Sequence, residues 1–325
     1  GAGRLARSTT VPSPTAESSG RLEGLQGTAP LADVPDGLRE RLERVAPTIG
    51  DDAPAAVRPY DAAIISALAA EEARSDAPAK IALDLATVTS GGERCTSYRA
   101  CREASDDLLD FDYDGPSGSV DLLADGQSGD ATFGVYQFDA HDQLAKVSTE
   151  SAEVPPPPEP NQRPNPGVGP RADGVLHIAM VFPTTGDAAP LAEAARAGVR
   201  VAVAEIDDEG GALGRPVELT DGDAGDGSPA ATQAAVAAAV QSGADVVIGG
   251  VAAADTAALV EPVTAAGLVL IGPGESGTIT SPGIRSGLVF RLRPPVGVHG
   301  TVLAATVADD GETQATVLYA DDADG

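Results

Sequence analysis

The sequence predicts an α/β protein in which a doubly wound parallel sheet, with helices on both faces, follows an α+β segment. Three observations support this fold class. From residue 175, short β-branched runs alternate with longer alanine-rich helical patterns, which is typical of βαβ units. The strand candidates are almost continuously apolar, as expected of strands covered on both faces. A proline-rich stretch separates this part from an N-terminal part that mixes helical and strand patterns.

The elements expected after residue 175 alternate along the chain. Leu191, Val199 and Ile206 recur at helical spacing after the first strand, and Gly210-Gly211 ends that helix. Ligands of open parallel sheets bind beyond the carboxyl ends of the strands, so loops 183–187, 249–255 and 272–278 are the expected binding loops. The expected strands are 176–182, 216–220, 245–250, 267–272, 288–293 and 314–319, and the further helices are 228–242, 254–266 and 296–310.

The N-terminal part is predicted to form an α-plus-strand unit without a complete sheet of its own. The stretch "YDAAIISALAAEEA", which begins at Tyr60, has helical spacing, and residues 78–87 carry a shorter helical pattern. Further on, "SVDLL" and "ATFGVYQF" indicate strands, the second by its period-two alternation.

The stretch "SAEVPPPPEPNQRPNPGVGPRADG", residues 151–174, holds eight prolines between positions 155 and 170. Proline fixes φ and lacks a backbone donor, so this run suits neither a helix interior nor a central strand. It is predicted to be an extended spacer between two independently built regions. The expected division is therefore 1–21, 22–150, the linker 151–174, and 175–325.

The composition limits the partners. Asp and Glu outnumber Lys and Arg by 49 to 21, and the net charge of −28 argues against binding to nucleic acid or to an anionic membrane. The longest uncharged run, residues 227–244, is too polar for a membrane span. The chain begins with Gly1 and stops at Gly325 after an expected strand, so we expect a fragment that lacks its natural ends.

The two cysteines, Cys95 and Cys101, lie in "CTSYRAC". This spacing can close a small disulfide loop in an oxidising compartment, and the alternative is two reduced thiols in a loop. The three histidines, His141, His177 and His299, are scattered without paired spacing. Neither a metal site nor a cofactor is therefore expected.

The order of motifs after the linker resembles a known family. The stretches "HIAMVFPTTGD", "EIDDEGGALGR", "ADVVIGG", "GLVLIGPGES" and "LVFRLRP" are similar to the first lobe of the periplasmic-binding-protein-like type I family. Within it they look most like the branched-chain amino-acid (Leu/Ile/Val) substrate-binding proteins of ABC transporters. The resemblance covers residues 175–325 and implies a hinged receptor that closes over an amino-acid-like ligand without catalysis.

The N-terminal part resembles the other end of the same family. The stretches "PYDAAIISALAAE", "KIALDLATVTSGGERCTSYRAC" and "FDYDGPSGSVDLLADGQSGDATFGVYQF" are similar to the C-terminal third of amino-acid substrate-binding proteins, over residues 22–148. The linker would thus join the tail of one copy to the head of another, in a tandem receptor or in a permuted single one. Because both parts belong mostly to one lobe in the family, residues 22–130 and 175–319 are expected to pack together.

The resemblance also implies ligand-binding residues in the expected loop 272–278. Ser276 in "GPGES" matches the position of a ligand-binding hydroxyl, and the backbone of Gly274 and Glu275 would contribute beside it. The alternative for Ser276 is a cap on the following turn. Glu275 is acidic where a small residue is usual in the family, and it either favours a cationic ligand or faces solvent.

The remaining site candidates depart from the family's pattern or have a plain structural alternative. In "GGVAAADT" Ala253 stands where relatives usually place a serine, so only backbone donors from Ala252 onward remain, which puts a standard amino-acid ligand in doubt. Thr185 either reaches the ligand or, with Thr184, only makes a turn. Tyr60 matches a family position at the cleft.

The resemblance implies a non-enzymatic, extracytoplasmic solute-binding receptor. It would bind a small molecule, an amino acid of the branched-chain type, and deliver it to an ABC transporter permease. One alternative is the ligand-sensing domain of a signalling receptor with the same fold. The other is a nucleotide-dependent Rossmann enzyme, which would need a glycine-rich loop directly after the first strand, where the chain has "PTTGD".

Overall fold

The computed structural model describes residues 20–107, 109–123, 125–129, 131–152, 154, 162–165, 167–186, 188–274, 285–309 and 311. The strand expected at 314–319 and the prolines at 155–158 lie outside these residues.

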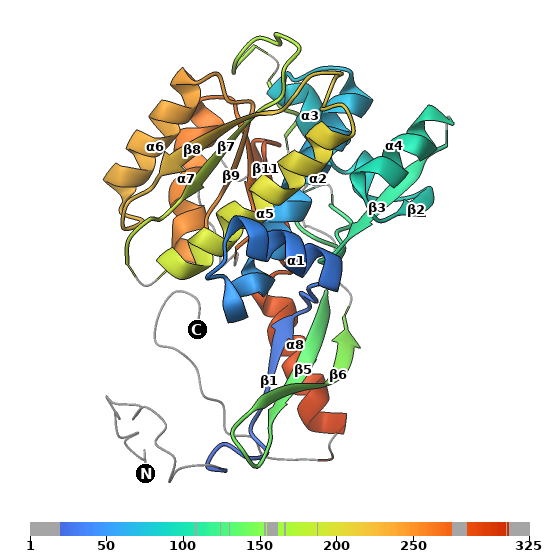
Figure 1. Ribbon diagram of the computed structural model, residues 1–325, viewed down its shortest axis with the longest axis vertical. Helices are drawn as coiled ribbons and strands as arrows, with labels where there is room; N and C mark the ends of the chain where they lie inside the picture. Colours follow the sequence, from blue (N-terminus) through green and yellow to red (C-terminus); the bar gives the residue numbers. More distant parts are fainter. Residues whose placement is uncertain are drawn as a thin grey trace.

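A five-stranded parallel sheet forms the centre of the molecule (Figure 1). Its order is β11-β10-β9-β7-β8, and every neighbouring pair is parallel. Five of the six predicted strands are confirmed with shifted ends, and β8 is shifted most, because it begins two residues and ends three residues later than expected. The strands are β7 (His177–Phe182), β8 (Glu218–Asp223), β9 (Val246–Gly249), β10 (Val269–Gly272) and β11 (Val289–Arg291).

Alternate side chains of the sheet enter two different cores, which confirms the doubly wound fold. Ala179 and Val181 of β7 face α6 (Pro229–Gln241) and α7 (Ala253–Ala265). Ile178 and Met180 of the same strand face the opposite way, toward α5 (Ala189–Asp208) and helices of the N-terminal part. This period of two explains the continuous apolar runs in the sequence, because both sides of each strand are buried.

The N-terminal part supplies much of the cover on the α5 side of the sheet. The helix α2 (Val57–Ala73) packs along α5, and its residues from Ala62 to Ala70 are all buried, together with those of α5 and the sheet. The other elements on this side are α1 (Asp36–Val45), the 3-10 helix η1 (Gly50–Ala56) and α3 (Pro78–Asp84). Residues from both sides of the linker therefore share one hydrophobic core, as the family resemblance led us to expect, while the limits of the four regions stay a prediction.

One glycine makes the contact between the two parts possible. Gly198 is buried in the middle of α5, and a Cβ atom added to it would overlap the carbonyl group of Ala56, where η1 meets α2. The Ala56 carbonyl group lies so close that the Cα atom of residue 198 can carry only a hydrogen atom on that side. The two helical segments therefore pack backbone against backbone at this point.

Gly198→Ala should destabilise the protein by about 1–3 kcal/mol, because the added methyl group pushes α5 away from η1. Gly297→Ala is the matched control, since Gly297 lies in a helix with no atom within 4 Å of an added Cβ. That control should be neutral or stabilising by up to about 1 kcal/mol. Urea denaturation of the two variants measures both effects, and equal stability of Gly198→Ala and the wild type would contradict this packing.

A second sheet projects from the body below α1 (Figure 1). It is antiparallel, in the order β1-β5-β6, with β1 (Gln26–Pro30), β5 (Thr132–Phe138) and β6 (Leu144–Ser151). The expectation that the N-terminal part has no complete sheet is thus wrong. The hydrophobic pattern of the sequence did not indicate two of these strands. The strand β1 is a short polar segment, and β6 is almost entirely exposed and lacks an apolar face.

The helix α8 (Val296–Asp309) was expected on the parallel sheet, but it packs on the antiparallel one. Val298 and Val302 contact the buried Phe133 of β5, and the ring of His299 stacks on Phe133 with centroids 5.0 Å apart. His299 Nε2 also lies 2.8 Å from the carbonyl oxygen of Thr28 in β1. The small apolar face of α8 packs on this sheet. The helical spacing of its apolar residues predicts that such a face exists, but not which of the two sheets covers it.

A third small sheet, β2-β3-β4, lies beside α4 (Tyr98–Asp106) and is held to it by a disulfide. Cys95 ends β2 (Glu93–Cys95) and bonds to Cys101 in α4, with the Cα atoms 5.2 Å apart. The other strands are β3 (Phe111–Gly115) and β4 (Gly118–Ser119), and η2 (Thr87–Thr89) precedes the sheet. The expected strand "SVDLL" is reduced to Ser119 in β4 and an isolated bridge from Leu122 to Ser128.

Two buried carboxylates accept hydrogen bonds from the backbone at the start of the parallel sheet. Asp76, at the end of α2, accepts hydrogen bonds from the backbone N–H groups of Asp173 (2.8 Å) and Gly174 (3.2 Å). Asp245, before β9, accepts one from the N–H of His177 at 3.0 Å. Burial raises the pKa of Asp245 to about 8; the His177 N–H opposes the shift, and the nearby charges of Asp76 and Asp173 add to it.

The folded protein therefore holds a proton on Asp245 that an unfolded chain, with an aspartate pKa near 3.9, releases. The stability that this group contributes is complete below about pH 4 and is lost as the pH rises toward about 8. Asp245→Asn keeps an acceptor for His177 and should reduce this loss by an amount on the order of 1–3 kcal/mol. Urea denaturation at about pH 5 and pH 8.5 measures it, with the exposed Asp208→Asn as control; an identical pH dependence in the wild type and Asp245→Asn would contradict the assignment.

Candidate functional site

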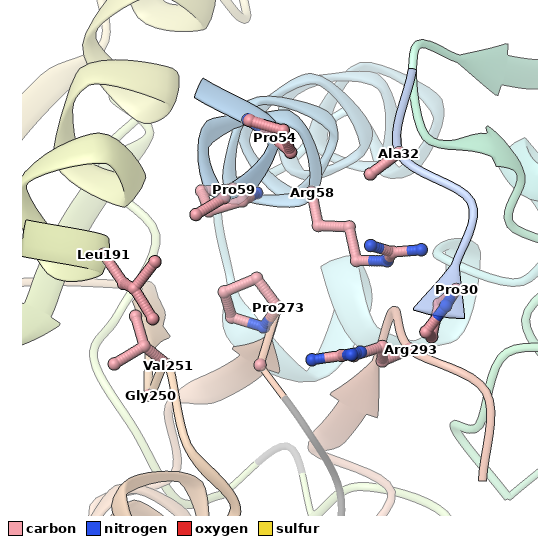
Figure 2. A pocket seen from close by; sticks show the side chains of 12 residues that line it. Pro30, Ala32, Pro54, Arg58, Pro59, Leu191, Gly250, Val251, Pro273 and Arg293 are labelled. Carbon is pink, nitrogen blue, oxygen red and sulfur yellow. The ribbon is translucent and has the colours of Figure 1, made fainter. Parts of the chain in front are cut away.

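A pocket of about 230 Å³ opens at the carboxyl edge of the parallel sheet (Figure 2). Two of the loops expected to bind a ligand form one wall, the loop after β9 through Gly250 and Val251 and the loop after β10 through Pro273 and Gly274. The remaining lining residues are Pro30, Ala32, Pro54, Ala55, Arg58, Pro59, Leu191 and Arg293.

Glycines allow the two loops to come together. Gly250 has a φ of +84°, which L side chains rarely adopt, and it turns the chain from β9 toward α7. A Cβ on Gly274 would lie only 2.6 Å from the carbonyl oxygen of Val251 and 2.8 Å from that of Gly250. The backbone of one loop therefore rests directly on the backbone of the other.

The loop after β9 leads into a helix whose first turn is capped. The backbone N–H of Ala252 donates to a carboxylate oxygen of Asp255 at 3.3 Å, and Thr256 Oγ1 donates to the Ala252 carbonyl oxygen at 3.2 Å. Because Val251 lines the pocket, the amino end of α7 lies beside it, and the carboxylate of Asp255 already occupies this positive end of the helix dipole.

The N-terminal part supplies the facing wall. Pro54 and Ala55 come from η1, Arg58 and Pro59 from the first turn of α2, and Pro30 ends β1. Arg58 is fixed by two carbonyl oxygens, that of Leu31 at 2.8 Å from Nη2 and that of Leu292 at 3.3 Å from Nε. Neither part of the chain makes this pocket alone.

Two guanidinium groups reach the pocket, and they come from opposite ends of the sequence. Arg58 extends from α2 and Arg293 from the segment after β11, and Figure 2 shows both side chains in the space between Pro30 and Pro273. Both arginines are half-buried. No acidic side chain is among the described residues that line the pocket, although the chain as a whole carries a net charge of −28.

The predicted site residues fall in several places. Gly274 lines the pocket, and Ala252 and the buried Ala253 follow Val251 directly at the start of α7 without lining it. Glu275 and Ser276 lie outside the described residues, so the predicted hydroxyl contact stays a prediction. The other two candidates, Thr185 and Tyr60, are away from the pocket lining.

Thr185 and its neighbour Thr184 have their own partners near β8. Both backbone N–H groups donate to the Gly225 carbonyl oxygen, at 3.0 Å and 2.9 Å, and Thr184 Oγ1 donates to Asp223 at 2.5 Å. Thr185 is exposed. These bonds favour the alternative in which the two threonines make a turn.

Tyr60 lies in the contact between α2 and α5. It is only 2% exposed, and its hydroxyl donates to a carboxylate oxygen of Glu205 at 2.7 Å, beside the ion pair of Arg41 with the same carboxylate. Burial, and then the charge of Glu205, raise the pKa of Tyr60 far above its usual value. Tyr60 thus has a packing role in the part of the chain that the structure describes.

The sequence reasoning missed Arg58 and Arg293, the two charged residues among the described lining of the pocket. The available signal was weak, since an arginine in "VRPYDAA" or "RLRPP" lies outside the three expected loops. As for metals, no group of three or more His, Cys, Asp or Glu side chains is arranged to hold an ion among the residues with described positions. None of the described helices is long and apolar enough to cross a membrane.

Part of the chain matches a known family model. Residues 175–325 match the model of the periplasmic binding protein family. The match covers somewhat less than half of the chain and begins at the end of the proline-rich stretch. Among curated proteins, no sequence matches the chain.

Several solved structures resemble parts of the chain. One is the branched-chain amino acid transporter substrate-binding protein LivJ from Streptococcus pneumoniae in complex with isoleucine, at 29% identity, over 37% of this chain and 34% of LivJ, with a TM-score of 0.33. Another is an ABC transporter substrate-binding protein from Desulfitobacterium hafniense, at 26% identity, over 46% of this chain and 43% of that one, with a TM-score of 0.37. A solute-binding protein from R. palustris in complex with benzoate is 25% identical, over 42% of this chain and 38% of that one, with a TM-score of 0.36. The chain thus spans less than half the length of each.

Gly274→Ala should separate the loops after β9 and β10, because the added methyl group lies too close to two carbonyl oxygens. We expect a loss of about 1–3 kcal/mol in the free energy of unfolding. Gly27→Ala in β1 is the control, since no atom lies within 4 Å of its added Cβ. Thermal denaturation of both variants measures the effect, and an unchanged melting temperature for Gly274→Ala would contradict the close approach of the loops.

Proposed function

We propose that this protein is an extracytoplasmic solute-binding receptor of an ABC importer, with an amino acid of the branched-chain type as its ligand. The observation that carries this proposal is the pocket at the carboxyl edge of the parallel sheet, built from the loops after β9 and β10. These two loops lie inside the segment that matches the periplasmic binding protein family. Binding at this edge is the general rule for open α/β sheets.

The lining of the pocket suits a small ligand with an apolar body. Apart from two arginines and two glycines, every described lining residue is a proline, an alanine, a valine or a leucine. A volume of about 230 Å³ is below the range of roughly 300–1,000 Å³ that drug-sized ligands occupy. A branched aliphatic side chain fits such a pocket better than a sugar or a nucleotide, whose many hydroxyl groups need polar partners.

The compartment and the partner follow from the same proposal. The disulfide between Cys95 and Cys101 supports an oxidising, extracytoplasmic compartment. A receptor of this kind hands its ligand to a transporter permease, so the permease is the proposed partner. We also propose that the chain combines the tail of one receptor copy with the head of another, since helices from both sides of the linker share one core.

Ligand-observed NMR on the 325-residue chain tests the receptor proposal. L-leucine, L-isoleucine and L-valine should show saturation transfer from the protein at millimolar concentration, whereas glucose should not. Ala32→Trp, which fills the pocket, should abolish the signal. Ala140→Trp is the matched control, because Ala140 lies in the exposed turn between β5 and β6.

Two results would count against the receptor proposal. If a protein that melts cooperatively gives no signal with any of the three amino acids, branched-chain amino acids are not its ligands. A signal that persists in Ala32→Trp would place binding elsewhere on the molecule.

A further inference from the structure

We propose that the linker acts as a strap, which fastens the amino edge of the parallel sheet and can be released while the rest of the chain stays folded. The strap is defined as the described linker residues 162–165 and 167–174. Its release loosens β10 and β11, the two strands whose carboxyl ends lead into Pro273 and Arg293 of the pocket. The contacts of the strap involve no ligand, so the proposal stands apart from the receptor function.

The strap meets the sheet beside several strands in turn. Gln162 donates its backbone N–H to the carbonyl oxygen of Arg285, before β11, at 2.9 Å. Further on, Gly169 contacts Gly267, which precedes β10, and the strap ends at its bonds to Asp76, just before β7. In the sheet order β11-β10-β9-β7, the strap therefore runs along the amino edge from β11 toward β7. A spacer between two independent regions would not follow the sheet in this way.

Glycines allow the strap to approach the sheet backbone against backbone. A Cβ atom on Gly267 would lie 2.5 Å from the backbone nitrogen of Gly169, and one on Gly169 would lie 2.6 Å from the Gly267 carbonyl oxygen. A Cβ atom on Gly287, shortly before β11, would overlap the carbonyl oxygen of Gln162. The strap is thus docked at two points where the body of the protein has a glycine.

The strap buries little of its own surface. None of its described residues is buried, and its valine, Val168, is 42% exposed. Segments with few buried apolar contacts open locally at a lower free energy than the core does. The strap should therefore leave the sheet in a local opening, and the rest of the chain should stay folded when it does.

The pair formed by β10 and β11 is the part of the sheet that depends most on the strap. These strands have only four and three residues, and β11 is at one end of the described sheet. The N–H of Leu270 donates to the Leu288 carbonyl oxygen at 2.7 Å, toward the amino edge. The N–H of Leu292 donates to the Gly272 carbonyl oxygen at 3.1 Å, at the carboxyl edge. Because the strands are so short, a loss of support at their amino ends should reach the carboxyl edge, where the pocket lies.

The chain offers a matched pair of glycines for the test. Gly267 and Gly243 follow the helices α7 and α6 with positive φ values, +72° and +82°, and each N–H donates to the carbonyl oxygen three residues earlier, at 3.0 Å and 3.1 Å. Gly243 has no atom within 4 Å of an added Cβ, whereas Gly267 touches the strap. Alanine strains the backbone similarly at both positions, so the difference between the two variants isolates the strap contact.

Amide hydrogen exchange of the 325-residue chain, followed by NMR, measures the release of the strap. In the wild type, the protection factor of the Gln162 N–H should be at least about tenfold lower than that of the buried Asp245, whose N–H donates to the His177 carbonyl oxygen at 2.9 Å. Low concentrations of urea should leave the exchange of Gln162 unchanged, because a local opening exposes little surface.

The variants test the contact and its effect on the strands. Gly267→Ala should lower the protection factors of Gln162, Leu270 and Leu292 about tenfold relative to Gly243→Ala. If Gly267→Ala does not fold, Gly169→Ala changes the strap alone and should have the same effect. Its control is Gly186→Ala, another glycine with positive φ and no atom within 4 Å of an added Cβ.

Three results would contradict the proposal. Equal protection of Gln162 and Asp245, with the same response to urea, would mean that the strap opens only when the whole chain unfolds. Equal protection factors in Gly267→Ala and Gly243→Ala would remove the contact between the strap and the sheet. Lower protection of Gln162 alone, with Leu270 and Leu292 unchanged, would overturn the link between the strap and the strands that lead to the pocket.

Discussion

The packing of α5 against the junction of η1 and α2 is the contact on which the described structure depends. Gly198 and Ala56 meet there without an intervening side chain, so α2 can run along α5 and bury its alanine-rich length. One face of the parallel sheet would otherwise expose Ile178, Met180 and their neighbours to water. A segment that precedes the linker therefore completes the core of a sheet that follows it. The described part of the linker is itself in contact with the body, since Gln162 donates to the Arg285 carbonyl oxygen at 2.9 Å.

The same contact creates the candidate site. Because α2 begins beside the carboxyl edge of the sheet, its first turn brings Arg58 and Pro59 opposite the loops after β9 and β10. The bond from Arg58 to the Leu292 carbonyl oxygen then ties the N-terminal part to the segment that carries Arg293. The candidate pocket and the joining of the two parts thus rely on the same few residues, and a change that loosens α2 from α5 should also disturb the pocket.

The sequence predicted the parallel sheet well because a doubly buried strand leaves a strong signal. Runs such as the one that forms β7 are apolar at every position, and glycine or proline marks most of their ends. Weak signals explain the failures: β6 is exposed along its length, and α8 has an apolar face that would fit either sheet. For the site, strand order predicted the loops with Gly250 and Gly274 but not Arg58 and Arg293. Those two arginines reach the same pocket because Arg58 contacts the carbonyl oxygen of Leu292. This contact joins distant parts of the chain, so no local sequence pattern predicts it.

Because the chain on both sides of the linker shares one core, we expect it to fold as one unit. The most direct measurement places a specific protease site among the prolines at 155–158, cleaves the folded protein, and follows the products by size-exclusion chromatography and chemical denaturation. We expect the two fragments to elute together at the size of the uncut chain and to unfold in a single transition. Two fragments that separate after cleavage, each with its own cooperative unfolding transition, would contradict it.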